Sequence, residues 1–536
     1  MPSNKALKSK SLIVLPYLII FLGVFIAYIN VYNNAFLWDD EFLIVKNAFI
    51  RSFKYVPQIF ALPSGAGANR IDNFYRPLQI FLYLLIYKVF GLNTTAFHFF
   101  NVLLHALNAV LLYHLLKRIF KGRSAFLTAF FWGIHPVHTE AVTYMSGTAD
   151  PLSFFFVLLS FLSYLYFRKN SSIKFLIGSF VFFAFALLSK ESVIVFPFIL
   201  VVYELYLLLK KQRRIDVKGL IHSFLNLIPL FVVSILYFIL RLTVLNFGNT
   251  LNFYSSQNIY AEHLSYRIYT FMATLPHYLS FIFYPVNLHM ERSFPVFVSI
   301  LSRQVLFPLI LTAVLFAVLF YAIRTSSSRD SPCSLIILFG ISWFFVFMIP
   351  FSGVIPVNAI ILEHWLYIPS VGILLSFFVL LSTFLPMNRS KNVERLLILC
   401  AFIVLILLTM NQNNTWRDPV TFYNHILKYE PGTARIHNNL AMAYEDLEEL
   451  DLAEEHYLKA IQIDDSYAQT RYNLARLYLK KGRIQEAIEN LNKSIEINPS
   501  FFYSYYLLSQ IYRLSGRIDL YEKYLKKAQE LKFYHG

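Results

Sequence analysis

Long apolar runs constrain the fold of this chain more than any other feature. A membrane-spanning helix needs roughly 17–25 apolar residues in succession, and about eleven segments have this length. They lie near residues 12–29, 96–116, 125–144, 151–167, 173–189, 192–209, 222–240, 304–323, 334–351, 365–385 and 393–410. With 57% hydrophobic and only 15% charged residues, the chain is too apolar for a set of water-soluble domains. The sequence therefore predicts an all-α, polytopic membrane protein.

Basic clusters indicate which side of the membrane each connection faces. They lie near residues 117–123, 168–169, 210–214, 324–329 and 389–395. Short basic connections are typical of the cytoplasmic side. The clusters share one side only if two ambiguous apolar stretches, 75–90 and 266–285, do not cross the membrane. We therefore expect both stretches to be interfacial or re-entrant elements within long outer loops.

This orientation makes the outer face the functional side. It carries the loop after the first run, a loop from about Leu242 to Arg303, and the loop from Ser352 to His364. Long, structured loops on one face are typical of binding and catalytic sites. The excess of 47 Lys and Arg over 31 Asp and Glu lies beside apolar runs, which indicates a lipid bilayer and not a nucleic acid as the partner.

The composition changes abruptly after residue 410, where charged and polar residues replace the apolar runs. Asn439-Leu440-Ala441 recurs 34 residues later as Asn473-Leu474-Ala475, which is the period of a tetratricopeptide repeat. We expect a membrane domain over 1–410, a linker or half-repeat over 411–430, and a water-facing solenoid of about three repeats over 431–536. Such a solenoid is typical of a protein-binding surface.

Asp39 and Asp40 follow the first apolar run almost directly and are the first candidates for catalysis. A positioned carboxylate can take the proton of an acceptor hydroxyl as a new bond forms. Paired carboxylates also suit Mg²⁺ or Mn²⁺. A solvated loop, with one acid capping a helix over 41–50, remains the simpler interpretation.

Further titratable residues are predicted to lie in or beside the outer loops. The candidates for binding a substrate or donor are Arg76, His135, His138, Glu140, Lys190, Glu191, Arg292, Glu363 and His364. Those between His135 and Glu140 belong to the third run and form either a pocket wall or a polar network that orients helices. Lys190-Glu191 is either an adjacent anchoring ion pair or a phosphate contact. The sequence contains no glycine-rich phosphate loop and no nucleophile elbow, which disfavours ATP hydrolysis and serine-hydrolase chemistry.

Several motifs occur in a fixed order before the repeats. They are Trp38-Asp39-Asp40, Tyr75-Arg76-Pro77-Leu78, His135-Pro136-Val137-His138-Thr139-Glu140, Ser189-Lys190-Glu191 and Leu366-Tyr367-Ile368-Pro369-Ser370. In this order the chain resembles the transmembrane and tetratricopeptide-repeat O-mannosyltransferases and their prokaryotic relatives, over nearly its whole length. There are two departures, because Thr148 stands where the family commonly has arginine and His364-Trp365 where an Arg-Tyr pair is usual.

The resemblance implies a GT-C-type helical bundle and an inverting sugar transfer on the outer face. The sugar, a hexose such as mannose, would pass from a polyprenyl-phosphate donor to a hydroxyl of a protein or glycan. Asp39 would be the base, and Asp40 would help to place the acceptor or a metal. Lys190 or an outer arginine would stabilise the phosphate leaving group.

The same resemblance implies one of two locations. The protein would lie in a bacterial inner membrane with periplasmic repeats, or in an endoplasmic reticulum membrane with lumenal repeats. Two other functions remain open at this point: a ligase or polymerase of lipid-linked oligosaccharides, and a non-enzymatic membrane-anchored repeat scaffold or transporter.

Overall fold

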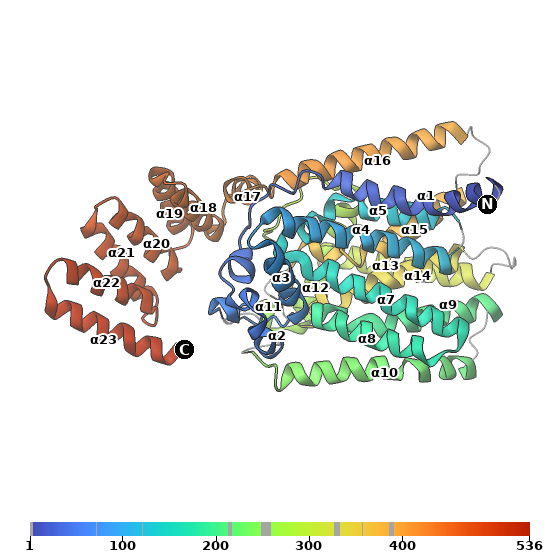
Figure 1. The fold of residues 1–536 in the computed structure, drawn as a ribbon, viewed down its shortest axis with the longest axis horizontal. Helices are drawn as coiled ribbons and strands as arrows, with labels where there is room; N and C mark the ends of the chain where they lie inside the picture. Colours follow the sequence, from blue (N-terminus) through green and yellow to red (C-terminus); the bar gives the residue numbers. More distant parts are fainter. Residues whose placement is uncertain are drawn as a thin grey trace. The chain divides into compact units, whose positions relative to one another are not determined.

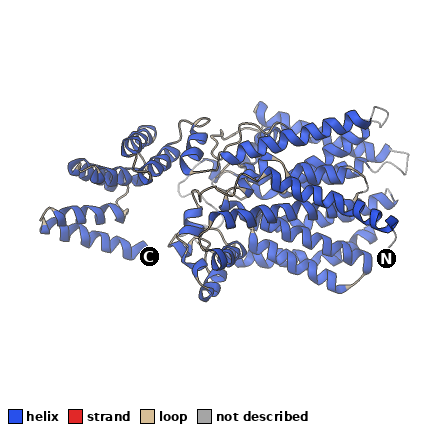
Figure 2. Ribbon diagram, turned by 45° about the horizontal axis from the view of Figure 1, so that its top comes forward, coloured by secondary structure: helices blue, strands red, loops and turns tan. Residues whose placement is uncertain are grey.

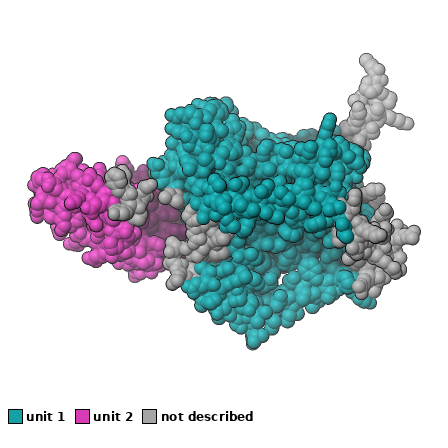
Figure 3. Space-filling view, turned by 90° about the horizontal axis from the view of Figure 1, so that it is seen from below, with its two compact units in different colours: residues 1–417 teal, residues 418–536 magenta. Residues whose placement is uncertain are grey.

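The computed structural model describes residues 4–70, 72–120, 122–212, 217–247, 259–325, 333–355, 357, 359–384 and 391–535. Regular structure in these residues is helical throughout, with no strand among them (Figure 2). They divide into two compact units, residues 1–417 and residues 418–536 (Figure 3). The predicted all-α fold is confirmed.

Unit 1 is a bundle of apolar helices of different lengths (Figure 1). They are α1 (Asn4–Ala27), α4 (Thr94–Ile119), α5 (Ser124–Gly133), α7 (Ala149–Asn170), α8 (Ile173–Ser189), α9 (Phe196–Gln212), α10 (Val217–Leu242), α13 (Arg303–Thr325), α14 (Cys333–Met348), α15 (Ser370–Phe384) and α16 (Lys391–Asn414). Among the described residues, 7 segments have the length and apolarity of a complete span. The other runs predicted to span correspond to the shorter apolar helices of α1, α5, α8 and α15. The chain is therefore a multi-pass membrane protein.

The predicted span over 125–144 is wrong in its second half. α5 ends at Gly133, and the chain continues through the short turns η5 (Pro136–His138), α6 (Thr139–Val142) and η6 (Met145–Thr148). Pro136 has no N–H to donate and keeps the preceding residue out of the helical region, and His135 is indeed extended with φ −83° and ψ 129°. The segment from His135 to Thr148 therefore leaves the helix as an irregular loop.

The two ends of the bundle differ in their connections (Figure 1). Short connections join the long helices at the end where α1 begins, whereas the other end carries the long loops. These loops contain η1 (Glu41–Val45), η2 (Ala48–Arg51), η3 (Phe53–Tyr55), α2 (Val56–Ala61), η4 (Ala66–Ala68), α3 (Pro77–Phe90), η7 (Glu191–Val195), α11 (Ile259–Glu262), α12 (Leu264–Phe283), η8 (Ile349–Phe351) and η9 (Glu363–Leu366). Parts of the predicted basic connections, residues 121, 213–216, 326–332 and 385–390, lie outside the described residues.

The two ambiguous stretches form helices that stay at the loop-rich end. α3 has only 14 residues, too few for a span. In the first turn of α12, Arg267 Nε donates to the carbonyl of Gly353 over 2.5 Å. In its last turn, the carbonyl of Ile282 lies 2.9 Å from His135 Nε2. Both partners belong to the loop-rich end, so α12 begins and ends there.

Unit 2 contains a short helix and three helix pairs with a regular step. The helices are α17 (Pro419–Leu427), α18 (Ala434–Asp446), α19 (Leu450–Ile463), α20 (Ala468–Lys480), α21 (Ile484–Ile497), α22 (Phe502–Leu514) and α23 (Ile518–His535). The first helices of successive pairs begin 34 residues apart, at Ala434, Ala468 and Phe502. Leu474 is buried between the pairs, as are its counterparts one period away, Leu440 and Leu508.

The turn inside each helix pair needs a left-handed residue. Gly482 and Gly516 take this position with φ of +74° in the second and third pairs. Glu448 takes it in the first pair with φ of +61°, a conformation that costs energy for a residue with a Cβ atom. The first pair therefore carries local strain that the other two avoid.

Candidate active site

Asp39 lies in the loop after α1 and keeps its carboxylate partly exposed, with 36% of the side chain accessible. Its Oδ1 is 2.8 Å from Arg70 Nη1, and its backbone N–H donates to the Tyr144 hydroxyl over 3.0 Å. Trp38 before it has φ of +47°, a region that non-glycine residues seldom occupy. Such an outlier is frequent where the surrounding structure holds a functional group in place.

Asp40 is buried and accepts hydrogen bonds from three donors. Its Oδ1 accepts from the Ser146 backbone N–H at 2.7 Å and from the Ser146 hydroxyl at 2.6 Å. Its Oδ2 accepts from the Leu37 N–H at 3.0 Å. Burial raises the pKa of Asp40 to about 7, although all three hydrogen bonds lower it. Asp40 does not cap the following turn. It ties the Asp39 loop to η6.

The adjacent pair expected of Lys190 and Glu191 does not form. Lys190 Nζ instead lies 2.6 Å from Asp150 Oδ1, with both side chains buried. Glu191 accepts two bonds from the Arg76 guanidinium, at 2.9 and 3.3 Å. Lys190 has an extended backbone with φ −158° and ψ 131°, and neighbouring side chains on extended backbone point to opposite sides. The result is two ion pairs, each joining residues far apart in the sequence.

Two further acids of the predicted site are buried and paired. Glu140 accepts from the His364 backbone N–H at 2.9 Å and lies 2.7 Å from His364 Nδ1. Burial pushes the pKa of Glu140 upward, but His364 more than offsets this and lowers it. Glu363 pairs with Arg292 and accepts from the His289 N–H at 2.7 Å. His364 therefore contacts a buried carboxylate.

The two histidines of the predicted pocket wall have different surroundings. His135 is buried and has a backbone partner at each ring nitrogen: the Ile282 carbonyl at 2.9 Å and the Val137 N–H at 3.2 Å. Burial lowers its pKa to about 4. His138 is also buried, and neither of its ring nitrogens has a hydrogen-bond partner among the described residues. Its ring packs 5.0 Å from Trp132 and 5.1 Å from Tyr367.

The structure brings in residues that the sequence did not single out as site residues. Arg70 and Tyr144 contact Asp39, Ser146 contacts Asp40, and Asp150 contacts Lys190. Arg70 could not have been predicted from the sequence, because no motif surrounds it and an arginine in a loop belongs to no periodic pattern. Asp150 could have been found, because an acid inside an apolar run needs a partner.

The described residues around Asp39 and Asp40 offer few ligands for a divalent cation. Both oxygens of Asp40 are used by protein donors, and Asp39 is paired with Arg70. Within the described part of the chain, no group of three His, Cys, Asp or Glu residues is placed to hold a metal. Mg²⁺ takes near-octahedral oxygen coordination, usually through one or two available carboxylates, and here only Asp39 keeps a partly exposed carboxylate, whose Oδ1 pairs with Arg70.

Comparison with known families and relatives gives matches in both parts of the chain. Residues 76–238 match the family described as dolichyl-phosphate-mannose-protein mannosyltransferase. Residues 432–500 and 472–532 match tetratricopeptide repeat models. The human protein O-mannosyl-transferase TMTC3 is 25% identical over 471 residues, which is 82% of this chain and 51% of that protein. The chain is similar to the protein O-mannosyl-transferases along most of its sequence.

A second relative and a solved structure also show similarity to this chain. The Caenorhabditis elegans protein O-mannosyl-transferase F38B6.6 is 27% identical over 463 residues, covering 83% of this chain and 62% of that protein. Among solved structures, ArnT from Cupriavidus metallidurans bound to undecaprenyl phosphate has 16% identity and a TM-score of 0.43, over 93% of this chain and 80% of that one. The chain spans about half to two thirds of the length of the relatives that it matches along most of its sequence.

Proposed function

We propose that this chain is a membrane glycosyltransferase of GT-C type. It transfers a hexose, such as mannose, from a polyprenyl-phosphate donor to the hydroxyl of a protein Ser or Thr. The proposal rests on the surroundings of Asp39. Its carboxylate is partly exposed at the loop-rich end and pairs with Arg70, and the neighbouring Asp40 is buried and attaches the loop to Ser146. The similarity to protein O-mannosyl-transferases supports the choice of sugar and acceptor.

In this reaction Asp39 is the general base. Its carboxylate takes the proton of the acceptor hydroxyl while the acceptor oxygen bonds to the anomeric carbon of the sugar. The bond from that carbon to the phosphate oxygen breaks, and its electron pair leaves with the lipid phosphate. Attack opposite the leaving group inverts the configuration. The Asp39–Arg70 pair has 36% and 44% exposed side chains, so opening it for the acceptor costs about 0–1 kcal/mol.

The leaving phosphate needs a cation, and Arg76 is the best placed of the candidates. Its partner Glu191 is 35% exposed, so a phosphate oxygen can join or replace that carboxylate at the guanidinium. Arginine also suits phosphate through paired, parallel hydrogen bonds. Lys190 is 4% exposed and its partner Asp150 6%, so reaching that ammonium requires opening a buried pair.

We further propose that the site faces away from the cytoplasm, toward the periplasm of a bacterium or the lumen of the endoplasmic reticulum. Basic residues at the opposite end of the bundle support this orientation. α16 ends at the site end, since Asn413 in its last turn donates to the Ala27 carbonyl over 3.0 Å and accepts from Thr143 at 2.8 Å. The chain thus enters the repeats on the site side of the membrane, where they would bind an acceptor or a partner protein.

Asp39→Asn tests the proposed base, because it keeps the shape of the side chain and removes its basicity. The assay follows labelled mannose from a polyprenyl-phosphate mannose into an acceptor peptide in proteoliposomes. We expect the rate to fall by about 10²–10⁴-fold, the usual contribution of general-base catalysis. The matched control is Glu41→Gln, an exposed acid two residues away that pairs with Lys46, and its rate should stay close to that of the wild type.

Two results would overturn parts of this proposal. An Asp39→Asn protein that transfers mannose at the normal rate would exclude Asp39 as the base. Transfer only from a pyrophosphate-linked oligosaccharide would indicate a ligase. We further propose that the transfer needs no metal, because no group of three metal-ligating residues gathers in the described part of the chain, so EDTA should leave the rate unchanged.

A further inference from the structure

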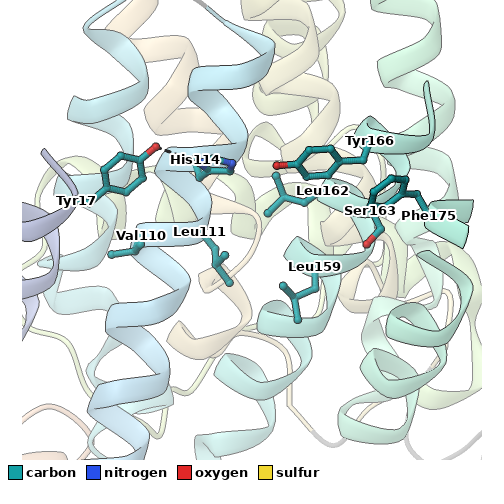
Figure 4. A pocket seen from close by; sticks show the side chains of 9 residues that line it. All are labelled: Tyr17, Val110, Leu111, His114, Leu159, Leu162, Ser163, Tyr166 and Phe175. Carbon is teal, nitrogen blue, oxygen red and sulfur yellow. Dashed lines mark hydrogen bonds between the residues drawn. The ribbon is translucent and has the colours of Figure 1, made fainter. Parts of the chain in front are cut away.

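An apolar groove lies between α1, α4, α7 and α8 (Figure 4). It encloses about 440 Å³, and its wall includes Leu111, Leu159, Leu162 and Phe175. Along α4 the groove residue His114 follows Asn101, which donates to the Val142 carbonyl near the site, by 13 positions. At 1.5 Å per residue this is roughly 20 Å, so the groove lies toward the end with the short basic connections.

A hydrogen-bonded network crosses the mouth of the groove. Arg118 Nε donates to His114 Nε2 over 2.8 Å, and Arg118 Nη2 donates to the Tyr166 hydroxyl over 2.8 Å. Tyr17 Oη lies 3.0 Å from His114 Nδ1. Because an arginine only donates, His114 Nε2 accepts, and the neutral ring donates from Nδ1 to Tyr17. In Figure 4, Tyr17 and His114 lie across the groove from Tyr166. The network holds the guanidinium at the rim.

Two neighbouring cations at this rim lack an acidic partner. Neither Lys117 nor Arg118 faces a carboxylate among the described residues. Their contacts are aromatic instead: Lys117 Nζ lies 5.4 Å from the ring centre of Tyr17, and the Arg118 guanidinium lies 4.7 Å from that of Tyr166. At the same end of α7, by contrast, Arg168 pairs with a buried glutamate at 2.9 Å. The rim of the groove therefore carries two positive charges that no carboxylate of the described residues neutralises.

We propose that this groove binds an anionic phospholipid of the surrounding leaflet. One acyl chain lies against the apolar wall, and the headgroup phosphate contacts Arg118 and Lys117. Basic pockets between membrane helices are typical sites for acidic headgroups. Free phosphate would leave the apolar wall uncovered. The proposal is independent of the transferase activity.

Native mass spectrometry of the purified full chain tests the charge part of the proposal. The protein in detergent is mixed with phosphatidylglycerol or with phosphatidylcholine of the same acyl length, and the bound lipid is counted. We expect clear preference for phosphatidylglycerol. A cation near the surface contributes about fivefold to binding, so Lys117→Gln with Arg118→Gln should weaken it about 30-fold. The matched control replaces Lys169 and Lys174, two exposed lysines at the same end, with glutamine and should bind as the wild type does.

Leu111→Trp tests the apolar part and leaves both cations in place, so it also keeps the proposal testable if the charge variant does not fold. The larger side chain fills the groove and should abolish the bound phosphatidylglycerol. Equal binding of the two lipids by the wild type, or unchanged binding by both variants, would overturn the proposal. Displacement of the lipid by millimolar inorganic phosphate would also overturn it, because a seated acyl chain resists a competitor that lacks one.

Discussion

Replacing Asp40 with Asn should remove a pH dependence from the stability of unit 1. In the wild type, burial raises the pKa of Asp40 to about 7 from an ordinary value of 3.8. An acid whose pKa is raised by folding stabilises the native state most at low pH. That stability is lost as the pH rises from the unfolded value toward the folded one. Asn does not titrate, so its contribution is the same at every pH.

The expected change in the free energy of unfolding follows from the pH interval between the unfolded and the folded pKa of Asp40. One pH unit well inside it corresponds to about 1.4 kcal/mol, but the slope halves where the pH reaches the folded pKa, so the change from pH 5 to pH 7 is about 2 kcal/mol. The Asp40→Asn variant also loses an amount of stability that does not depend on pH. Its amide group cannot accept from all of the Leu37 and Ser146 donors that Asp40 now satisfies. A buried donor left without an acceptor costs about 1–3 kcal/mol.

Thermal unfolding in detergent at pH 5, 6, 7 and 8 measures both effects. The variant should be less stable than the wild type at pH 5, and the gap should close or reverse by pH 8. Glu41→Gln, which removes an exposed acid from the same loop, should leave the wild-type pH profile intact. If the Asp40→Asn curve runs parallel to that of the wild type, Asp40 is not the titrating group and the reasoning fails.

Three other predictions concern paired or strained residues. Arg76→Lys keeps the charge but loses the paired bonds to Glu191, so kcat/KM for the donor should fall about tenfold or more; an unchanged value would remove Arg76 from the site. Lys190→Met leaves Asp150 buried without a partner and should cost about 3–5 kcal/mol in thermal unfolding, most of which Asp150→Asn added to it should restore. Glu448→Gly should stabilise the first repeat by about 1 kcal/mol, because glycine adopts the left-handed conformation without strain, and should slow its hydrogen exchange. Gly482→Ala places a Cβ atom at the equivalent turn and should speed hydrogen exchange in the second repeat.

The sequence predicted the architecture well because apolar length and repeat spacing are local properties. Every predicted span corresponds to a helix of the bundle, and the 34-residue step reappears in the starts of α18, α20 and α22. The exception is the run over 125–144, where hydropathy continued through a segment that Pro136 takes out of the helix. Hydropathy indicates how well a segment dissolves in lipid. It does not show where a helix ends, which here depends on the extended backbone that Pro136 imposes on the residue before it.

The pairing of charges could not be predicted, because it depends on which distant segments meet. Lys190 and Glu191 are neighbours in sequence, yet their partners come from α7 and from the start of α3. Asp39 and Asp40 also separate: the first is partly exposed and the second is 1% exposed. The sequence does not distinguish two adjacent acids. The fold shows that the Asp39 carboxylate is available to a substrate, whereas the Asp40 carboxylate stabilises the loop.

The charges at the two ends of unit 1 predict opposite responses to salt. At the site, Arg76 and Lys190 already have the carboxylates of Glu191 and Asp150, so this cluster is neutral before a donor binds. A donor phosphate binds there by replacing a carboxylate as the partner of a cation. The two charges are then in direct contact, and salt screens such a contact little. Raising the salt from 0.05 to 0.5 M should therefore change the KM for the donor less than twofold.

At the groove, Lys117 and Arg118 are exposed and face no carboxylate among the described residues. Their attraction for an acidic headgroup acts through water and weakens as the Debye length shrinks from about 14 Å to about 4 Å over the same salt range. Bound phosphatidylglycerol should then fall several-fold while donor affinity stays nearly constant. A donor KM that rises as steeply as lipid binding falls would mean that the donor is attracted by unpaired cations, and the exchange of partners at Arg76 would be the wrong mechanism.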